Sequence, residues 1–431
     1  MKNSIEQIYS IYKNFPLIST DSRNIKPNSI FFAIKGDNFD GNSFAAQALE
    51  SGAKYAVIDN PDFCINDNCI LVENTITALQ QLASLHRKTL KIPILGITGS
   101  NGKTTTKELL FSVVSKKFKT LATTGNLNNH IGVPLTILSI KPEHEFAIIE
   151  MGANHVGEIG ELCKIAQPDF GIITNIGKAH LEGFGGPEGV IRTKNDLYLS
   201  VKQNNGIVFV NHNNDLLMQL SNEIKRFTYG NNKEADYYGD ITLNNPFLEI
   251  SFIYKNDTYN IKSKIFGAFN FENIMAAVSV GLYFDINPNL IISAIEEYIP
   301  SNNRSQLVKT EKNTIILDAY NANPTSMKNS IENFVNQSFD KKILILGDML
   351  ELGEYSGEEH KNIINLIKNL KLYKTILVGN EFYKQKSNEN IDYFINLEDV
   401  ISFLKQLDIN NAHILLKGSR KIGLEKLLPY L

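Results

Sequence analysis

Short apolar runs alternate along the chain with polar stretches in which apolar residues recur at the spacing of one helix face. The apolar runs are rich in β-branched and aromatic residues, which predicts strands, and the amphipathic stretches between them predict helices. This alternation is typical of α/β proteins with mainly parallel sheets. The predicted strands of the N-terminal and central parts are SIFFAI (29–34), YAVID (55–59), KIPILGIT (91–98), FAIIEM (146–151), FGIITNI (170–176) and GIVFVN (206–211).

The pattern changes twice farther along the chain. Between residues 241 and 266, apolar and polar residues alternate on both sides of the turn-like segment KNDT (255–258), which predicts a β-hairpin. After a predicted linker at PSNN (300–303), the alternation of strands and helices restarts as a second doubly wound unit. Its predicted strands are TIILDAY (314–320), KILILGD (342–348), YKTILVG (373–379) and AHILLKG (412–418).

The composition indicates an ordinary globular protein of several domains. The chain has 431 residues, and at about 150 residues per domain this length suggests roughly three domains. Its 43 basic and 46 acidic residues give a formal charge of −3. Binding of nucleic acid through bulk positive charge is therefore not expected.

The cysteines and the apolar runs favour a cytoplasmic protein. Cys64, Cys69 and Cys163 are odd in number and lack paired zinc spacing, which disfavours a disulfide framework and a structural zinc site. No apolar run approaches the roughly 20 residues of a membrane helix, and the N-terminal segment lacks the apolar block of a signal peptide. We expect reduced thiols, a cytoplasmic location and no membrane insertion.

The strongest local motif is GITGSNGKTTTKELL (96–110), in which a predicted strand ends in a glycine-rich turn before a helix. This order is typical of a P-loop, whose N–H groups bind phosphates while Lys103 reaches the β- and γ-phosphates and Thr104 binds Mg²⁺. The match is imperfect, because the P-loop pattern requires glycine where this chain has Ile97. A purely structural turn is the alternative.

Two further residues follow predicted strands and are candidate Mg²⁺ ligands. Glu150 ends the run FAIIE, and His180 lies in the segment that follows FGIITNI. The carboxyl ends of adjacent parallel strands meet at one edge of a sheet, where ligands of α/β proteins bind. Taken singly, a glutamate or histidine after a strand is more often a solvated or helix-capping side chain, and it is the shared position of the two that favours a ligand role.

Several motifs together resemble the Mur ligase family over nearly the whole chain. DAYNANPTSM (318–327) and GDMLELGEYSGEEH (347–360) are most similar to the branch of that family that adds a dipeptide. The other matching motifs are TDSRNIKPNSIFFAIKGDNFDG (20–41), GITGSNGKTT (96–105), IIEMGANHVGEI (148–159), TNIGKAHLEGFG (174–185) and LLKGSRKIGLE (415–425).

The resemblance implies three domains. They are an N-terminal UDP-binding α/β domain (1–90), a central P-loop ATPase-like domain with a mainly parallel sheet (91–301) and a C-terminal Rossmann-like doubly wound domain (302–431). Because these domains would meet around ATP, we expect hinges near 88–92 and 300–304 in a monomeric protein.

The resemblance also implies the residues that bind ATP and two Mg²⁺ ions. Thr104 and Glu150 would hold the first ion, and His180 the second, supported by Lys194 after carboxylation of its amine by CO₂. The family's glutamate two residues after that lysine is Asp196 here, and an unmodified lysine is the alternative. ATP would contact Thr98, Gly99, Ser100, Asn101, Gly102, Lys103, Thr104, Asn270, Asn273, Arg304 and Asp318.

The substrate-binding residues are likewise implied by the resemblance. Ser22 and Arg23 would bind the UDP end, although Asn42 stands where the family often has histidine. Turns and helix caps are the alternative role for most of these residues. The remaining candidates are Asn126, Asn128 and Asn129 toward the muramoyl peptide, and Tyr320, Asn321, Asn323, Asp348, Lys417 and Ser419 toward the second substrate.

The implied activity is an ATP-dependent ligase that joins D-alanyl-D-alanine to UDP-N-acetylmuramoyl-tripeptide through an acyl phosphate, releasing ADP and phosphate. This reaction belongs to peptidoglycan synthesis, and so to cell wall biogenesis, cell shape and cell division. A sister ligase or folylpolyglutamate-type synthase that adds one amino acid is the nearest alternative. A non-catalytic nucleotide-binding scaffold is the alternative of another class.

Overall fold

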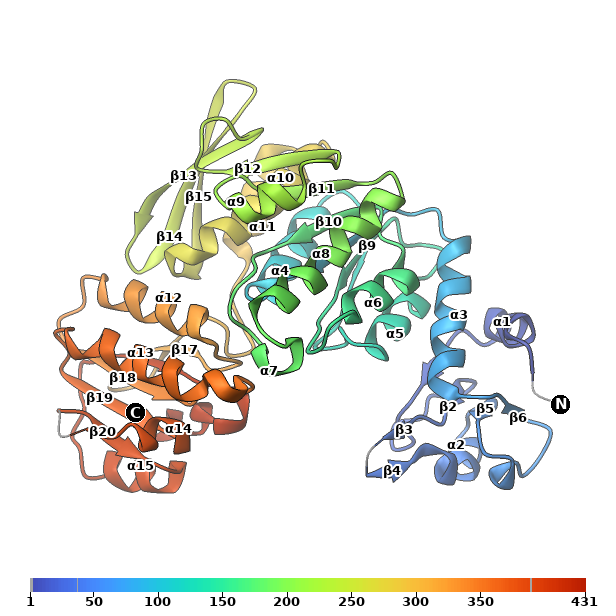
Figure 1. Ribbon diagram of the computed structural model, residues 1–431. Helices are drawn as coiled ribbons and strands as arrows, with labels where there is room; N and C mark the ends of the chain where they lie inside the picture. The colour runs from blue at the N-terminus through green and yellow to red at the C-terminus, as the bar shows by residue number, and fades with distance from the viewer. Residues whose placement is uncertain (1–2, 37, 388–389) are drawn as a thin grey trace.

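The computed structural model describes residues 3–36, 38–387 and 390–431, and it confirms an α/β fold with mainly parallel sheets (Figure 1). In the N-terminal part the sheet has the parallel order β1 (Ile18–Ser19), β2 (Ile30–Phe32), β5 (Tyr55–Ile58), β6 (Cys69–Leu71). Its other elements are α1 (Ile5–Asn14), the β3 (Lys35–Gly36) and β4 (Phe39–Asp40) ladder, η1 (Gly41–Phe44), α2 (Ala45–Glu50), η2 (Pro61–Phe63) and α3 (Thr75–Thr89).

The central sheet runs in the order β15-β14-β13-β12-β11-β10-β7-β9-β8 and is parallel from β8 to β13. The predicted hairpin is confirmed as β14 and β15, and the sheet also contains β13, which the pattern did not separate. The strands are β7 (Ile94–Thr98), β8 (Thr120–Ala122), β9 (Phe146–Glu150), β10 (Phe170–Ile173), β11 (Ile207–Asn211), β12 (Arg226–Gly230), β13 (Tyr237–Asn244), β14 (Phe247–Tyr254) and β15 (Asp257–Phe266).

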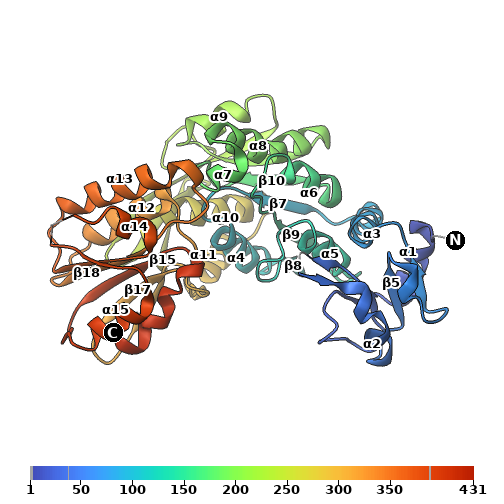
Figure 2. The same ribbon diagram turned by 60° about the horizontal axis from the view of Figure 1, so that its bottom comes forward.

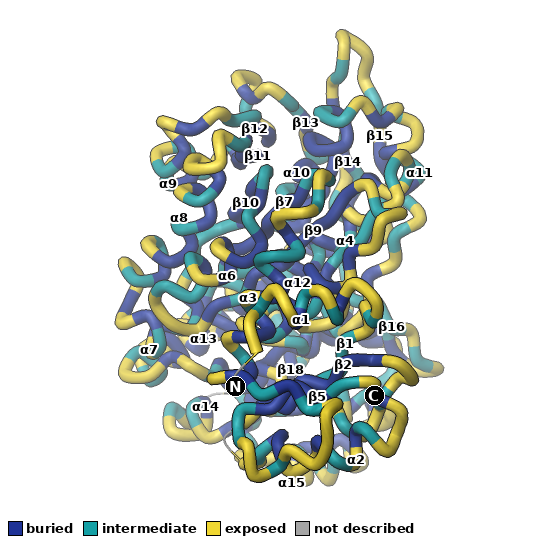
Figure 3. The backbone as a smooth tube through the Cα atoms, turned by 90° about the vertical axis from the view of Figure 1, so that its right-hand side faces the viewer, coloured by how far each residue is buried: buried dark blue, intermediate teal, exposed yellow. Residues whose placement is uncertain are grey.

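Helices cover both faces of this sheet, because alternate side chains of its strands point to opposite sides. In β9, Ala147 and Ile149 pack with α5 (Gly132–Leu138), α6 (Glu158–Ala166) and α8 (Pro187–Gln203). Phe146 and Ile148 pack on the other side with α4 (Lys103–Val114), α10 (Phe271–Tyr283) and α11 (Pro288–Glu297). Figure 3 shows these strands as the buried interior. The remaining elements are α7 (Leu181–Phe184), α9 (Asp215–Leu220) and η3 (Ala268–Asn270).

The C-terminal sheet has the order β16-β17-β21-β18-β19-β20 and is parallel except at β16. The central part lies between the N-terminal and C-terminal parts (Figure 2). The strands are β16 (Gln306–Lys309), β17 (Thr314–Asp318), β18 (Lys342–Gly347), β19 (Lys374–Val378), β20 (Asp392–Phe394) and β21 (His413–Lys417). The helices are α12 (Pro324–Val335), η4 (Gly353–Tyr355), α13 (Ser356–Lys368), α14 (Asn380–Lys384), α15 (Leu397–Leu404), η5 (Arg420–Ile422) and η6 (Leu424–Tyr430).

Helix α3 fixes the N-terminal part to the central part. The Nε atom of Arg87 donates to the carbonyl of Ala166 at 2.9 Å, and its Nη2 atom donates to Gln167 O and Asp169 Oδ2, each at 2.9 Å. The Tyr12 hydroxyl donates to Leu138 O at 2.6 Å. These bonds bridge the predicted hinge at 88–92, so the guanidinium of Arg87 restrains this connection.

None of the helices in the described ranges combines the length and the apolar character that a membrane crossing requires.

We predict that Arg87→Met lowers the free energy of unfolding by about 2–4 kcal/mol, because several buried carbonyl groups and Asp169 lose their charged donor. Chemical denaturation measures this loss. Arg23→Met is the matched control: the Arg23 side chain is 86% exposed, against 9% for Arg87, and should change stability by less than about 0.5 kcal/mol. Equal effects of the two substitutions would contradict the bridging role of Arg87.

Candidate active site

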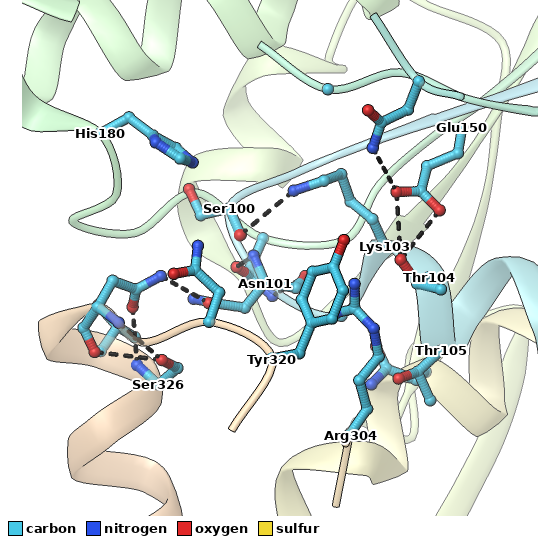
Figure 4. A pocket seen from close by; sticks show the side chains of 18 of the residues that line it. Ser100, Asn101, Lys103, Thr104, Thr105, Glu150, His180, Arg304, Tyr320 and Ser326 are labelled. Atoms are coloured by element: carbon cyan, nitrogen blue, oxygen red, sulfur yellow. Dashed lines mark hydrogen bonds between the residues drawn. The ribbon is translucent and has the colours of Figure 1, made fainter. Parts of the chain in front are cut away.

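A cavity of about 1430 Å³ lies where the P-loop motif, the ends of the central strands and the first turn of α12 meet. Figure 4 shows that its side chains come from both the central and the C-terminal parts of the chain. Predicted site residues from distant motifs therefore share one cavity. Those that line it are Ser100, Asn101, Gly102, Lys103, Thr104, Asn126, Asn128, Asn129, Glu150, His180, Asn270, Asn273, Arg304, Asp318, Tyr320, Asn321, Asn323 and Lys417.

The glycine-rich turn is held by the two residues that directly follow β10. Ser100 N donates to Asn175 O at 2.9 Å, and Asn101 N donates to Asn175 Oδ1 at 3.0 Å. The Thr174 hydroxyl donates to Asn101 O at 2.6 Å. Gly102, with φ +80°, precedes α4 and cannot cap its first N–H groups with a side chain. The turn therefore presents a helix N-terminus to the cavity, an arrangement that suits anions.

Lys103 is the first residue of α4, and its ammonium group bends back over the turn. Its Nζ donates to Gly99 O at 2.6 Å. Burial lowers the pKa of Lys103 to about 8; the Glu150 carboxylate opposes this shift and the Arg304 guanidinium adds to it. A bound anion would offset the cost of burying this ammonium group by supplying the opposite charge, as a phosphate does in a P-loop.

Thr104 and Glu150 form a buried pair beside Lys103 (Figure 4). The Thr104 hydroxyl lies 3.0 Å from Oε2 and 3.2 Å from Oε1 of Glu150. Asn128 Nδ2 donates to Glu150 Oε1 at 2.9 Å. Hydroxyl, carboxylate and amide oxygens are the hard ligands that Mg²⁺ prefers, so this donor set fits that ion.

His180 lines the same cavity but faces the C-terminal part of the chain. Its Nδ1 atom forms an ion pair with the Glu351 carboxylate. The hydrogen bond from His180 lowers the pKa of Glu351 against the opposing effect of burial. Among the described residues, no three histidine, cysteine, aspartate or glutamate side chains form a metal site. A cation near His180 would therefore need ligands of other kinds.

Lys194 lies on α8 and is not among the residues that line the cavity. It is 2% exposed, and its Nζ atom is 5.4 Å from the centroid of the Phe184 ring. Burial, helped by the Lys103 ammonium, lowers the pKa of Lys194 well below its ordinary value. A neutral amine is the form that reacts with CO₂, so this environment fits the predicted carboxylation.

The amides of Asn270 and Asn273 brace the helix that follows the P-loop. Asn273 Oδ1 accepts from the Thr106 hydroxyl at 3.0 Å, and Asn273 Nδ2 donates to Asn270 Oδ1 at 2.8 Å. Asn270 Nδ2 donates in turn to Phe266 O at 2.9 Å. Both residues line the cavity, yet these bonds give them a structural role in addition to the predicted contact with a nucleotide.

The C-terminal part contributes charged side chains at the carboxyl ends of its strands. Lys417 Nζ donates to Asp318 Oδ2 at 2.6 Å. Burial opposes ionisation of Asp318, but bonds from Lys417, Ser330 and Ser305 outweigh it, so its pKa is lowered. The guanidinium of Arg304 stacks on the Tyr320 ring, 3.6 Å from the centroid.

Asn323 joins the C-terminal part directly to the P-loop. Its side-chain oxygen caps α12 by accepting from Ser326 N at 2.9 Å, while its Nδ2 atom donates to Asn101 Oδ1 at 2.7 Å. One amide thus sets both the start of α12 and its distance from the glycine-rich turn.

The cavity lining among the described residues does not include some of the predicted residues. Arg23 is exposed and paired with Asp21. Asp348 accepts from Glu381 N at 2.8 Å and Phe382 N at 2.9 Å, which makes it the cap of α14. Turn and cap chemistry therefore accounts for part of the predicted substrate set. The predicted residues outside the lining are Ser22, Arg23, Thr98, Gly99, Lys194, Asp348 and Ser419.

The structure also brings to the cavity residues that were not predicted. Asn329 and Asn333 lie on α12, Asn336 is the residue that directly follows this helix, and Gln80 reaches the cavity from α3. The spacing of the three asparagines, four and then three residues, places them on one helix face and was the available signal. Gln80 offered none, because only packing of α3 against the central part brings it there.

Comparison with known proteins gives the same family along the chain. Matches cover residues 14–87 (Mur ligase family, catalytic domain), 97–281 (Mur ligase middle domain) and 303–420 (Mur ligase, glutamate ligase domain). The chain is 34% identical over 423 residues to the UDP-N-acetylmuramoyl-tripeptide–D-alanyl-D-alanine ligase of Bacillus subtilis (strain 168), with 95% of this chain and 92% of that protein covered.

Solved structures are also similar. Crystal structure I of MurF from Acinetobacter baumannii matches with a TM-score of 0.86 and 31% identity, covering 96% of this chain and 92% of that one. MurF ligase from Thermotoga maritima, in complex with ADP, matches with a TM-score of 0.85 and 28% identity, covering 96% of each chain.

We predict that Gly102→Ala weakens binding of a nucleoside triphosphate at least about tenfold. A Cβ atom at Gly102 would lie 2.6 Å from Asn273 Oδ1, so the turn must shift away from its phosphate-binding shape. Titration with a fluorescent nucleotide analogue measures the affinity. Gly52→Ala is the control, because Gly52 also has a positive φ but its nearest neighbouring atom is 3.6 Å away. Unchanged affinity in Gly102→Ala would refute this role.

Proposed function

Because the chain belongs to the Mur ligase family, we propose that it is an ATP-dependent ligase that joins D-alanyl-D-alanine to UDP-N-acetylmuramoyl-tripeptide in peptidoglycan synthesis. The observation that carries this proposal is the shared cavity. Lys103, the Thr104–Glu150 pair and the C-terminal Arg304 converge there, which is the arrangement that phosphoryl transfer between bound substrates requires.

The P-loop and Arg304 hold the phosphates of ATP. The N-terminus of α4 and the ammonium of Lys103 supply positive charge, and the Nε atom of Arg304 is buried without a hydrogen-bond partner among the described residues. An anion is the natural partner of that unpaired donor. Asn270 and Asn273 keep α4 in place behind the turn while the nucleotide is bound.

The reaction activates the terminal carboxylate of the tripeptide. A carboxylate oxygen attacks the γ-phosphorus, the bond from that phosphorus to the bridging oxygen breaks, and ADP leaves with the electron pair. The amine of D-alanyl-D-alanine then attacks the acyl phosphate carbon and loses a proton as phosphate leaves. Lys103 compensates the negative charge during the first step, so its contribution is electrostatic and positional.

Mg²⁺ is the expected cofactor, and the residues present fit it. Thr104 and Glu150 hold one ion in this proposal, with Asn128 orienting the carboxylate. When bound, the ion neutralises phosphate oxygens. His180 is a candidate ligand for a second ion, which requires that its pairing with Glu351 be exchanged for the cation.

Carboxylated Lys194 would support that second ion. The amine attacks CO₂ to form a carbamate and releases a proton, which converts a neutral group into an anion. Burial lowers the pKa of Lys194, which favours the neutral amine that this chemistry needs. Phe184 and the rest of the α7–α8 region exclude water from the lysine, which slows loss of the carbamate.

The sheets support domain boundaries at 1–90, 91–301 and 302–431 as part of this proposal, since described strands pair only within each range. Movement is then expected at 300–304, where Asn302 and Asn303 have positive φ values, as does Ser305 directly after this segment. The first domain holds the UDP end through Ser22 and Arg23, whose guanidinium is exposed and can exchange Asp21 for a phosphate.

A sister ligase that adds a single amino acid is the second candidate. The motif DAYNANPTSM, which provides Tyr320, Asn321 and Asn323 to the cavity wall, argues against it because it resembles the dipeptide-adding branch, as does the 34% identity to a D-alanyl-D-alanine ligase of that branch. The scaffold hypothesis is disfavoured by the simultaneous presence of the Thr104–Glu150 pair, His180 and Lys194, because simple nucleotide binding does not need two metal sites.

Phosphate release from ATP with UDP-N-acetylmuramoyl-tripeptide tests the proposal. We expect release that depends on D-alanyl-D-alanine, with the mass of the acceptor increased by one added dipeptide. Lys103→Ala serves as the inactive control. Release that depends only on a single amino acid would identify a sister ligase, and no release with either would favour the scaffold.

The carbamate has a separate test. Lys194→Ala should lose at least about a hundredfold in kcat, because removal of a group that positions transition-state charge has effects of this size. Short carboxylic acids such as acetate should restore part of the rate, since they can occupy the place of the carbamate. Lys202→Ala, on the same helix and exposed, should behave like wild type. Full activity of Lys194→Ala would exclude the carbamate.

A further inference from the structure

One contact between the central and C-terminal parts uses two residues that have no role in the proposed chemistry. Lys178, between the P-loop partner Gly177 and His180, places its Nζ atom 2.6 Å from Glu359 Oε1 on α13. The pair joins the central part to the motif GDMLELGEYSGEEH of the C-terminal part.

The two members of this pair differ in their exposure. The Glu359 side chain is 8% exposed and the Lys178 side chain is 54% exposed. An exposed ion pair contributes little to stability, but a buried carboxylate that loses its cation is costly. Burial of the Glu359 carboxylate therefore favours the arrangement of the two parts in which the Lys178 ammonium lies against it.

The segment that contains Lys178 is hydrogen-bonded to the P-loop. Gly177 N donates to the Ser100 hydroxyl at 2.9 Å, and that hydroxyl lies 3.1 Å from Gly177 O. Lys178 N donates to Thr325 Oγ1 at 3.4 Å. Ser100 and His180 both line the cavity (Figure 4). A displacement of Lys178 would therefore also displace the glycine-rich turn and His180, the candidate metal ligand.

The neighbour of Glu359 fixes the other side of the contact. His360 is fully buried; its Nδ1 atom donates to Ser356 O at 2.7 Å, and its Nε2 atom accepts from Met349 N at 3.0 Å. Met349 begins the loop that carries Glu351 to His180. Glu359 contacts Lys178, and His360 holds the loop whose Glu351 contacts His180. Because Glu359 and His360 are consecutive, these two contacts of the 177–180 segment are kept at a fixed separation.

We propose that Lys178 and Glu359 are positioning residues: their ion pair holds the C-terminal part closed and orients the 177–180 segment, with Ser100 and His180, for the phosphoryl transfer. This inference rests on the proposed function for its catalytic consequence. It gives Glu359 and His360, at the end of the motif GDMLELGEYSGEEH, a role in holding the C-terminal part closed.

The test uses the full-length protein and the variants Lys178→Met, Glu359→Gln and their combination. Lys178→Met leaves a buried carboxylate unpaired, so we expect kcat to fall about tenfold. The ATP dissociation constant should stay within about twofold, because the phosphate-binding groups are kept. Glu359→Gln should lose less. The combination should be more active than Lys178→Met alone, since the second substitution removes the unpaired charge.

Small-angle scattering with an ATP analogue and UDP-N-acetylmuramoyl-tripeptide gives a readout that does not depend on turnover. With both ligands present, the Lys178→Met variant should remain more extended than wild type. The variant that combines Lys178→Met with Glu359→Gln should become as compact as wild type. Lys202→Met is the matched control, because Lys202 pairs with the exposed Glu223 within the central part and should match wild type in both measurements.

Wild-type compaction in Lys178→Met, or losses that simply add in the combination, would overturn the positioning role. If the wild-type protein compacts but releases no phosphate, the proposed function fails while the scattering comparison still decides on the ion pair.

Discussion

The pairing of β7 with its two parallel neighbours is the constraint on which the site depends. Ile97 lies opposite Glu150 of β9, and Thr98 lies opposite Ile173 of β10. Because parallel strands end at the same edge, this register places the P-loop, a carboxylate and the segment leading to His180 side by side. A shift of one residue would turn Glu150 away from Thr104 and toward the opposite face of the sheet.

The rest of the cavity is completed by parts of the chain that are far apart in sequence. The Asn101–Asn323 bond and the Lys178–Glu359 ion pair connect the central sheet to the first turns of α12 and α13. Both contacts use polar groups at an interface, so they can break when water enters and form again when it leaves. Such an interface suits a ligase that must admit substrates and then enclose them.

The N-terminal part has a different connection. Arg87 and Tyr12 bond to carbonyl groups of the central part, and α3 packs against α5 and α6 through apolar residues. Apolar packing of this kind does not open easily, because separation would expose it to water. Sequence analysis predicts hinges at both ends of the central part, and the bonds of Arg87 and Tyr12 restrain the first of these connections.

Much of the fold could be predicted from the amino-acid sequence. Alternation of apolar runs and amphipathic stretches indicated the α/β class, and alternation of single apolar and polar residues indicated the hairpin. The consecutive residues Gly102, Lys103 and Thr104 indicated the glycine-rich turn before α4. These features depend on neighbours within about ten residues, so local patterns encode them. The short β8 and β20, and β13 beside the hairpin, are too brief or too mixed in polarity for such a pattern.

Only the tertiary structure decided which predicted residues share the cavity and what holds them there. Asp348 caps α14, Asn273 braces α4, and the Glu359 carboxylate meets Lys178 from another part of the chain. A polar side chain satisfies whichever donor or acceptor the fold brings near it, and that partner is often a hundred or more residues away. For this reason the sequence determined the kinds of groups available for chemistry, and packing determined which of them are free to perform it.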